Sequence, residues 1–249
     1  MKVTAFVGSA RKKHTYNAVE HFLGHLKSYG PVECEIVSLS DCSLEICLGC
    51  ALCCNRGEEL CPLKDDRDEL LAKIAASDGI IFATPNYSFN VSGLMKVFMD
   101  RLGFLFHRPR FFGKAFTGIV AQGIYGGNKI VDYFNFVGRA LGCNVVKGSC
   151  ITTLEPITES GQAKINRIIE AHSKKFYSTL IKKELPVPTL FELMLFRVSR
   201  SSIKRILDES WADYRYYKAQ GWFESDYFYP TRLNPIKKLA GKIFDRLKF

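Results

Sequence analysis

Apolar residues follow two patterns along this chain. Short, fully apolar runs alternate with longer segments in which apolar residues recur every three or four positions. The short runs are typical of strands buried on both faces, and the longer segments of helices that cover a sheet. The predicted strands are the start of segment 3–17 and residues 32–39, 79–84, 115–121 and 145–152; the predicted helices are 18–26, 65–76, 92–105 and 129–141. This alternation predicts an α/β fold, a doubly wound five-stranded parallel sheet of order 2-1-3-4-5.

The segment Val3–Asn17, VTAFVGSARKKHTYN, joins the first strand to the first helix. A loop that opens a helix presents unpaired backbone N–H groups at the positive end of the helix dipole. Ser9, Arg11, Thr15 and Tyr16 add further donors, so the loop suits a phosphate. The glycine patterns of dinucleotide and nucleoside triphosphate sites are both absent, which leaves a mononucleotide, with FMN as the first candidate. The alternative is an ordinary turn whose Ser and Thr cap the helix.

Two more loops are rich in Gly, Asn, Ser and Tyr. They are residues 85–93 (PNYSFNVSG) and 122–127 (QGIYGG), after the third and fourth predicted strands. In a doubly wound sheet these loops meet the first loop at the carboxyl edge, where ligands bind. Such residues allow backbone to approach a planar ring while amides bond its edge, although turns alone also favour them.

Nine cysteines are present, and most lie between Cys42 and Cys61. An odd, crowded set differs from a secreted disulfide framework and indicates metal or redox chemistry in a reducing compartment. The spacing C-x2-C-x2-C-x7-C, followed by a proline, favours a four-iron four-sulfur cluster. Structural zinc and a loop without metal are the alternatives. The predicted ligands are Cys47, Cys50, Cys53 and Cys61, with Cys54 competing for the third position.

Three segments carry a family resemblance: GSARKKHTYNAV, TPNYSFNVSGLMKVFMDR and AQGIYGG. They resemble the flavin-contacting segments of the flavodoxin-like NAD(P)H-dependent FMN reductases, and the cysteine run is similar to that of their iron–sulfur flavoprotein branch. The resemblance covers residues 1 to about 182. The first loop departs from the common form at Ala10 and His14. In the resembled branch, the cluster communicates with FMN across a subunit interface.

The resemblance assigns FMN contacts to each loop. It implies that the first loop holds the phosphate, that the second lies along the ring and the ribityl chain, and that the third meets the polar edge of the ring. The implied residues are Ser9, Arg11, Thr15 and Tyr16; then Pro85, Asn86, Tyr87, Ser88 and Ser92; then Gln122, Gly123, Tyr125 and Gly126.

Length and charge add a second region to this picture. The 249 residues, 47% of them hydrophobic, suit an FMN-binding domain over residues 1–183, with the cysteine loop 42–61, and a basic, aromatic helical extension over 184–249. Residues 185–249 hold 12 Lys and Arg against 7 Asp and Glu, within a net charge of +10. No apolar run reaches the length of a membrane span and Met1 leads directly into a strand, so we expect a cytoplasmic protein.

The last part of the extension, residues 233–249, carries apolar residues near helical spacing with lysines among them. Such a helix suits an anionic membrane surface, but packing on its own domain or on a partner subunit is the expectation here. We therefore expect a homodimer or homotetramer and no nucleic-acid partner. Arg101 is expected to be an exposed helix charge, and the stretch 104–112 (FLFHRPRFF) a subunit contact rather than a substrate loop.

The predicted function is that of an FMN-dependent oxidoreductase. It would move electrons between NAD(P)H or ferredoxin and a quinone, an oxygen species or a protein acceptor, with the chemistry carried by FMN rather than by a catalytic side chain. The alternatives are a non-enzymatic flavodoxin-like electron carrier and a membrane-docked or scaffold flavoprotein.

Overall fold

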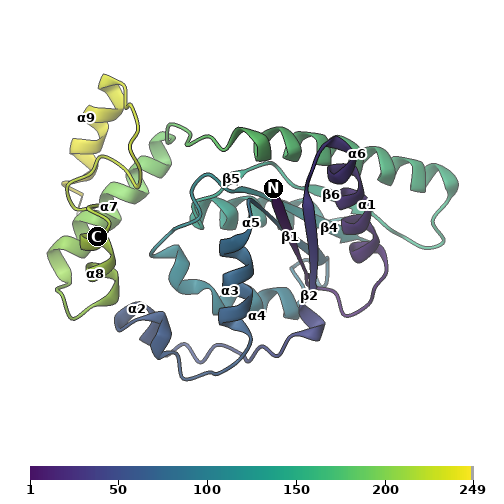
Figure 1. The fold of residues 1–249 in the computed structure, drawn as a ribbon, viewed down its shortest axis with the longest axis horizontal. Coiled ribbons are helices and arrows are strands. Elements are labelled where there is room, and N and C mark those ends of the chain that lie inside the picture. Colours follow the sequence, from purple (N-terminus) through teal and green to yellow (C-terminus); the bar gives the residue numbers. More distant parts are fainter. Residues whose placement is uncertain (248–249) are drawn as a thin grey trace. The chain divides into compact units, whose positions relative to one another are not determined.

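The computed structural model describes residues 1–247 and divides into two compact units. The first unit comprises Met1–Cys47 and Lys64–Glu184, and the second comprises residues 48–63 and those from 185 onward. The cysteine segment 48–63 thus shares its unit with the C-terminal extension (Figure 1). The division of roles between residues 1–183 and 184–249 stays a prediction.

The first unit is built on one parallel sheet. Its strands are β1 (Lys2–Val7), β2 (Glu33–Ser38), β3 (Gly79–Pro85), β4 (Ala115–Gln122), β5 (Asn144–Val145) and β6 (Ser149–Thr152). The order is β2-β1-β3-β4-β5, with β6 also paired to β4. β1 and β3 are almost wholly buried, as apolar strands between two helical layers should be. The predicted doubly wound α/β fold is confirmed.

The predicted fifth strand is divided into two short strands. Gly148 lies in the gap, where a Cβ atom would come within 2.5 Å of the Gly118 carbonyl oxygen. The backbone N–H of Gly148 donates to Asn135 Oδ1 at 3.2 Å instead of to a neighbouring strand. This close approach requires glycine at position 148, and the pairing with β4 resumes at Ser149.

Helices α1 (His14–Tyr29) and α6 (Glu159–Lys182) lie side by side on one face of the sheet (Figure 1). Phe22 and Phe176 meet edge to face with centroids 5.6 Å apart. Between these helices and β4, His172 bonds Thr117 Oγ1 at 2.6 Å and Ser149 Oγ at 2.8 Å. Burial, together with the nearby Lys175 charge, lowers the pKa of His172 to about 4, so the imidazole is neutral at pH 7. Helix α6 was not predicted from the sequence.

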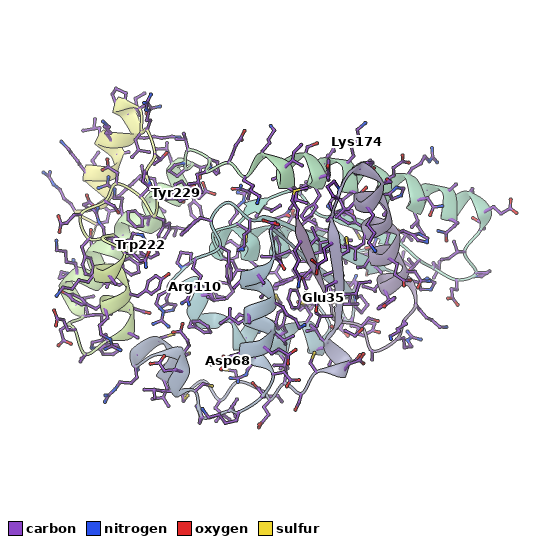
Figure 2. All side chains as sticks on the ribbon, in the orientation of Figure 1. Glu35, Asp68, Arg110, Lys174, Trp222 and Tyr229 are labelled. Atoms are coloured by element: carbon purple, nitrogen blue, oxygen red, sulfur yellow. The ribbon has the colours of Figure 1, made fainter. Side chains whose placement is uncertain are left out.

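The opposite face carries an aromatic core. Phe6, Phe82 and Phe116 of the sheet pack against Phe98 of α4 (Gly93–Arg101) and Phe134 of α5 (Gly127–Ala140). Burying each of these rings contributes about 1.5–3 kcal/mol. The same unit contains α3 (Arg67–Ala76) and the short 3-10 turns η1 (Leu39–Asp41) and η3 (Gly103–Phe106). Lys73 Nζ of α3 lies 2.6 Å from Oε1 of Glu35 on β2, and Glu35 is labelled in Figure 2.

The stretch 104–112 turns largely inward. Phe104 and Phe111 are buried, and Arg108 is 1% exposed. The guanidinium groups of Arg67, Arg108 and Arg110 lie 5.7, 5.7 and 5.5 Å from the centroid of the Phe104 ring. Most of this basic aromatic sequence therefore belongs to the packing of the first unit.

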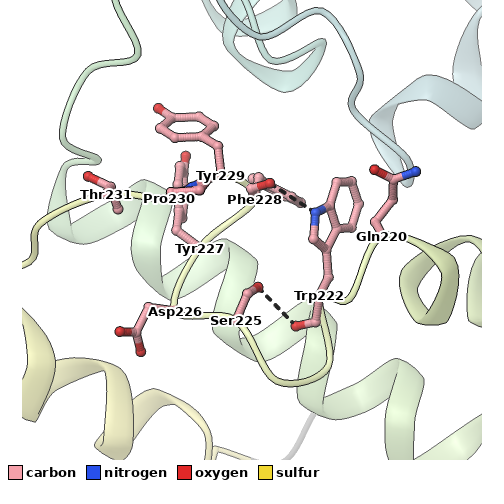
Figure 3. A pocket seen from close by; sticks show the side chains of 9 residues that line it. All are labelled: Gln220, Trp222, Ser225, Asp226, Tyr227, Phe228, Tyr229, Pro230 and Thr231. Atoms are coloured by element: carbon pink, nitrogen blue, oxygen red, sulfur yellow. Dashed lines mark hydrogen bonds between the residues drawn. The ribbon is translucent and has the colours of Figure 1, made fainter.

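The second unit combines α7 (Leu190–Ile206), α8 (Ala212–Ala219) and α9 (Pro235–Phe244) with the short α2 (Leu52–Asn55) and η2 (Glu58–Leu60) of the cysteine segment. Thr189 and Glu192 form a capping box at the start of α7. Trp222 donates to the Phe228 carbonyl at 2.9 Å beside a cavity of about 380 Å³ (Figures 2 and 3). α2 packs on α8, and Arg215 donates to the Arg56 carbonyl at 2.6 Å. Of the predicted terminal helix, Lys248 and Phe249 lie outside the described residues.

Candidate functional site

The three predicted loops leave the sheet at the same edge. Val7 pairs with Ala83, and Pro85 with Ala121, so β1, β3 and β4 end within a few residues of one another at the same edge. Backbone bonds then tie the loops together: Gly8 N–H donates to the Ala83 carbonyl at 2.8 Å, and Asn86 N–H to the Ala121 carbonyl at 2.7 Å. The sequence-predicted loops therefore converge at the carboxyl edge, where doubly wound sheets bind ligands.

The first loop leads into an uncapped helix. α1 begins at His14, and within the described part of the chain no side chain caps its amino end. Its first turn holds no acidic residue among positions 14–17. Ser9 Oγ donates to the Arg11 carbonyl at 2.9 Å, which shapes the turn, and the Arg11 side chain is exposed beside it. Open N–H groups and a nearby guanidinium suit a phosphate.

Two other predicted residues of this loop lie on the first turn of α1. Thr15 is buried and Tyr16 is half-buried, with Lys12 Nζ 5.6 Å from the centroid of the Tyr16 ring. His14 lies between them and Lys13, and its Nε2 is 2.7 Å from Glu155 Oε1. His14, one of the two residues by which this loop departs from the common form, thus links the helix start to the loop after β6.

The second loop contains an unusual tight turn. Tyr87 and Asn90 exchange two backbone hydrogen bonds of 3.0 Å, and the residues between them, Ser88 and Phe89, have φ of +50° and +62°. Side chains other than Gly and Asn seldom adopt this left-handed conformation, which costs about 1 kcal/mol or more per residue. The turn leaves Phe89 60% exposed and Tyr87 48% exposed. Strain of this kind marks functional segments more often than structural ones.

Ser92 holds the end of the second loop in place. Its Oγ donates to the Gly8 carbonyl at 2.5 Å and accepts from Met95 N–H at 3.2 Å, which makes it the N-cap of α4. Its own N–H donates to Thr84 Oγ1 at 2.9 Å. Ser92 is buried, and its bond to Gly8 joins the second loop to the first.

The third loop pairs with the second through Asn86. Asn86 Nδ2 donates to the Tyr125 carbonyl at 2.9 Å, and the Phe89 and Tyr125 rings lie with centroids 5.2 Å apart. Gly126, at φ +92°, has no room for a Cβ atom, which would fall 2.8 Å from Phe89 Cδ1. Gln122 Oε1 accepts from Gly127 N–H at 2.7 Å and so fixes the start of α5.

One buried acceptor at this edge has no partner. Asn86 Oδ1 is shielded from water and accepts no hydrogen bond from any residue between 1 and 247. A buried amide oxygen without a donor is costly, by about 1–3 kcal/mol, so its presence indicates a ligand N–H. Phe89 and Ile124, the latter 72% exposed, belong to the same edge but were not singled out from the sequence. Their only signal was an apolar residue within an otherwise polar loop.

The predicted cluster ligands differ in their burial. Cys47 and Cys50 are exposed, Cys61 is buried, and the sulfurs of Cys53 and Cys54 lie 4.0 Å apart. Gly49 and Ala51, on either side of Cys50, have φ of +65° and +56°. Within residues 1–247, no three Cys, His, Asp or Glu side chains lie close enough to hold a metal ion. The four predicted ligands are therefore near in sequence but are not assembled as a site.

Similarity to known proteins identifies the family of this chain. Residues 1–153 match the model of the NADPH-dependent FMN reductases. An iron–sulfur flavoprotein of Archaeoglobus fulgidus is 30% identical over 233 residues, 89% of this chain and 100% of the relative. The chain belongs to the NADPH-dependent FMN reductase family.

Solved structures agree on the fold of this FMN reductase family member. RosB, solved with bound 8-demethyl-8-formylriboflavin-5'-phosphate, has a TM-score of 0.59 at 13% identity, covering 94% of this chain and 92% of that one. A flavodoxin, the WrbA-like protein of Agrobacterium tumefaciens, has a TM-score of 0.51 at 14% identity, covering 74% and 99%. The flavodoxin-like fold and the resemblance to the FMN reductases, with iron–sulfur flavoproteins among the relatives, are confirmed.

The carboxyl edge of this family member fits FMN on its own features. The uncapped helix start would offer donors to a phosphate and the unpartnered Asn86 Oδ1 an acceptor to a ring N–H, and Gly123 has nothing within 4 Å of the position of a Cβ atom. A flat ring and a terminal phosphate match these three features together. Which side chains contact the flavin stays a prediction for every residue assigned above.

The base of the cysteine segment is firmly held by the first unit. Asp65 accepts from Arg101 Nη2 at 2.9 Å and from Glu45 N–H at 2.9 Å, while Asp66 accepts from Ser43 N–H at 2.7 Å. Burial acts to raise the pKa of Asp65, but hydrogen bonds from Arg101 and from backbone N–H groups outweigh it and lower that pKa. The expectation that Arg101 is an exposed charge was wrong: both side chains of the pair are at most 3% exposed.

Proposed function

We propose that this chain is an FMN-dependent oxidoreductase whose flavin lies at the carboxyl edge of β1, β3 and β4. The observation that carries the proposal is the convergence of three loops on one edge with an uncapped helix start and an unpartnered buried acceptor. Membership of the FMN reductase family supports it. The proposed contacts are Ser9, Arg11, Thr15 and Tyr16 at the phosphate; Pro85, Asn86, Tyr87, Ser88 and Ser92 along the ring and ribityl chain; and Gln122, Gly123, Tyr125 and Gly126 at the polar edge.

The protein's own contribution is to bind and orient. FMN, when bound, supplies hydride or single-electron transfer, so no acid–base side chain is required. Arg11 and the α1 N–H groups would hold the phosphate, and Asn86 Oδ1 would accept from an N–H at the edge of the ring. The rings of Tyr87, Phe89 and Tyr125 are exposed at this edge, and beside a bound flavin they would limit the access of water.

The cysteine segment is proposed to hold a four-iron four-sulfur cluster through Cys47, Cys50, Cys53 and Cys61. Four thiolates are the donor set for such a cluster, and the relatives named iron–sulfur flavoproteins support the assignment. Cys47 and Cys50 are exposed and would be accessible to iron, and no group of three possible metal ligands is already assembled among residues 1–247.

Donor, acceptor and assembly complete the proposal. We expect NAD(P)H or a reduced ferredoxin as donor and a quinone, an oxygen species or a protein as acceptor, in a homodimer or homotetramer without nucleic acid. The nine cysteines, an odd number crowded mainly between Cys42 and Cys61, suit a reducing, cytoplasmic setting. No helix between residues 1 and 247 is long and apolar enough to cross a membrane.

Steady-state kinetics test the proposal against its alternative, a flavodoxin-like carrier. Anaerobically purified protein, with its flavin identified by chromatography, would be mixed with NADH or NADPH and a soluble quinone, and nicotinamide oxidation followed. With reduced ferredoxin in place of the nicotinamide, the same assay tests the other donor. Sustained turnover with either donor is expected. A flavin that exchanges electrons once but turns over with neither donor would contradict an enzymatic role.

A further inference from the structure

Helix α9 presents its apolar face outward. Ile236, Leu239 and Ile243 are 73%, 64% and 54% exposed, and their spacing of three and four residues places them on one stripe of the helix. Of the residues of α9, all of which the structure describes, only Gly241 is buried. The stripe is therefore not packed on its own domain, while packing on a partner subunit, the other expected arrangement, stays a prediction.

Polar contacts fix the helix in this orientation. Gly241 lies against α7, where a Cβ atom would come within 3.2 Å of Arg197 Nε. Asn234 caps the helix by accepting from Lys237 N–H at 2.9 Å, and Lys237 Nζ donates to the Pro188 carbonyl at 2.7 Å. Asp245 pairs with Arg197 Nη1 at 3.0 Å and with Arg200. The stripe is therefore not needed to hold α9 in the fold.

The charges around the stripe all have one sign. Lys238, Lys242 and Arg246 are exposed and follow one another at four-residue spacing, which places them along one flank of the stripe. The acidic residue of this segment, Asp245, is turned toward two arginines of α7. The outward surface of α9 thus combines aliphatic side chains with cations.

We propose that α9 docks this protein on the surface of an anionic phospholipid bilayer. Aliphatic side chains flanked by cations are the chemistry that an interfacial helix offers to acyl chains and anionic headgroups. A second copy of the chain fits less well, because in an antiparallel two-fold pair of α9 helices Lys238, Lys242 and Arg246 of both copies would lie along the same side of the interface. The helix would lie in the membrane surface without crossing it, and the inference is independent of the proposed redox function.

Vesicle flotation of the full-length protein tests the docking. The probes are vesicles of phosphatidylcholine alone and of phosphatidylcholine mixed with phosphatidylserine. Wild type should float with the anionic vesicles only, and added salt should weaken the binding. The double variants Leu239→Ser with Ile243→Ser, and Lys238→Glu with Lys242→Glu, should each lower partitioning by about tenfold or more.

Matched controls lie on α6 of the other unit. Ile181→Ser removes an exposed apolar side chain, and Lys164→Glu with Lys174→Glu makes the same change of charge, so neither should alter partitioning. Circular dichroism and light scattering of every variant show whether the fold and the oligomer are intact. The proposal is overturned if wild type does not float, if the α6 controls lose binding as the α9 variants do, or if the Leu239→Ser, Ile243→Ser variant dissociates an oligomer while partitioning is unchanged. The last result would assign the stripe to a second copy.

Discussion

The carboxyl edge of the sheet and the cysteine segment are both candidate cofactor sites, but they exist to different degrees in the polypeptide alone. At the edge, hydrogen bonds from Gly8, Asn86 and Ser92 hold the loops in one arrangement. In the cysteine segment, Asp65 and Asp66 hold the two ends, while Cys47 and Cys50 remain exposed. A parallel sheet pre-organises the loops that leave it, whereas the proposed cluster ligands are not brought together within residues 1–247.

Loss of a single predicted cysteine ligand should abolish the cluster and leave the flavin edge intact. Replacing Cys50 with Ala should remove nearly all iron and acid-labile sulfide from anaerobically purified protein, because a cluster needs all its thiolates. FMN should remain bound at one per chain. Cys34→Ala is the control, since burial raises the pKa of that thiol and keeps it protonated. Iron retained in Cys50→Ala, or wild type without iron, contradicts the ligand assignment.

The next effect tests the anchored base of the cysteine segment. Asp65→Ala removes the carboxylate paired with the buried Arg101, and breaking a buried pair costs about 3–5 kcal/mol of unfolding free energy. Asp100→Ala, which breaks the exposed Lys96–Asp100 pair, should cost about 1 kcal/mol or less. Urea denaturation of the two variants compares them. Equal losses would show that the base is not specially held.

A third test concerns the sheet beneath the flavin edge. The lowered pKa of His172 means that the unfolded chain binds this proton below about pH 6.5, while the folded protein does so only near pH 4. Unfolding free energy should therefore fall as pH drops through that window, by about 3 kcal/mol from this group. His172→Gln should remove that part of the pH dependence. An unchanged pH profile in the variant would contradict a neutral, buried imidazole.

The smallest effect lies within the flavin edge. Arg11→Ala combined with Ser9→Ala removes a cation and a turn-forming hydroxyl from the phosphate loop, which should weaken FMN binding by about tenfold to a hundredfold. Arg139→Ala, on the last turn of α5, is a control for the loss of one positive charge. Fluorescence titration of the apoprotein measures both. If the double variant bound FMN with unchanged affinity, this loop would not be the phosphate site.

Much of the fold follows from local patterns, because buried parallel strands are apolar along their whole length. The strand order and the three converging loops came from that signal alone. Helix α6 was missed although Ile165, Ile169 and Phe176 are buried at helical spacing, since His172 places a polar residue on the same face. That histidine is tolerated only because Thr117 and Ser149, distant in sequence, bond it.

The rest depends on long-range or backbone features that spacing does not encode. Arg101 is buried because Asp65, 36 residues earlier, lies beside it. The left-handed turn at Ser88 and Phe89 contains no glycine, so the sequence does not predict it. Cysteine spacing predicts which thiols bind a metal, but not whether they are assembled before it arrives.

Calorimetric titration of the apoprotein with FMN, riboflavin and FAD tests whether a mononucleotide flavin is held by its phosphate at the start of α1. We expect one FMN per chain. Riboflavin should bind about a hundredfold more weakly, because it lacks the phosphate that the uncapped helix and Arg11 would receive. FAD should also bind more weakly than FMN. If riboflavin or FAD bound as tightly as FMN, the phosphate would not be held at the start of α1.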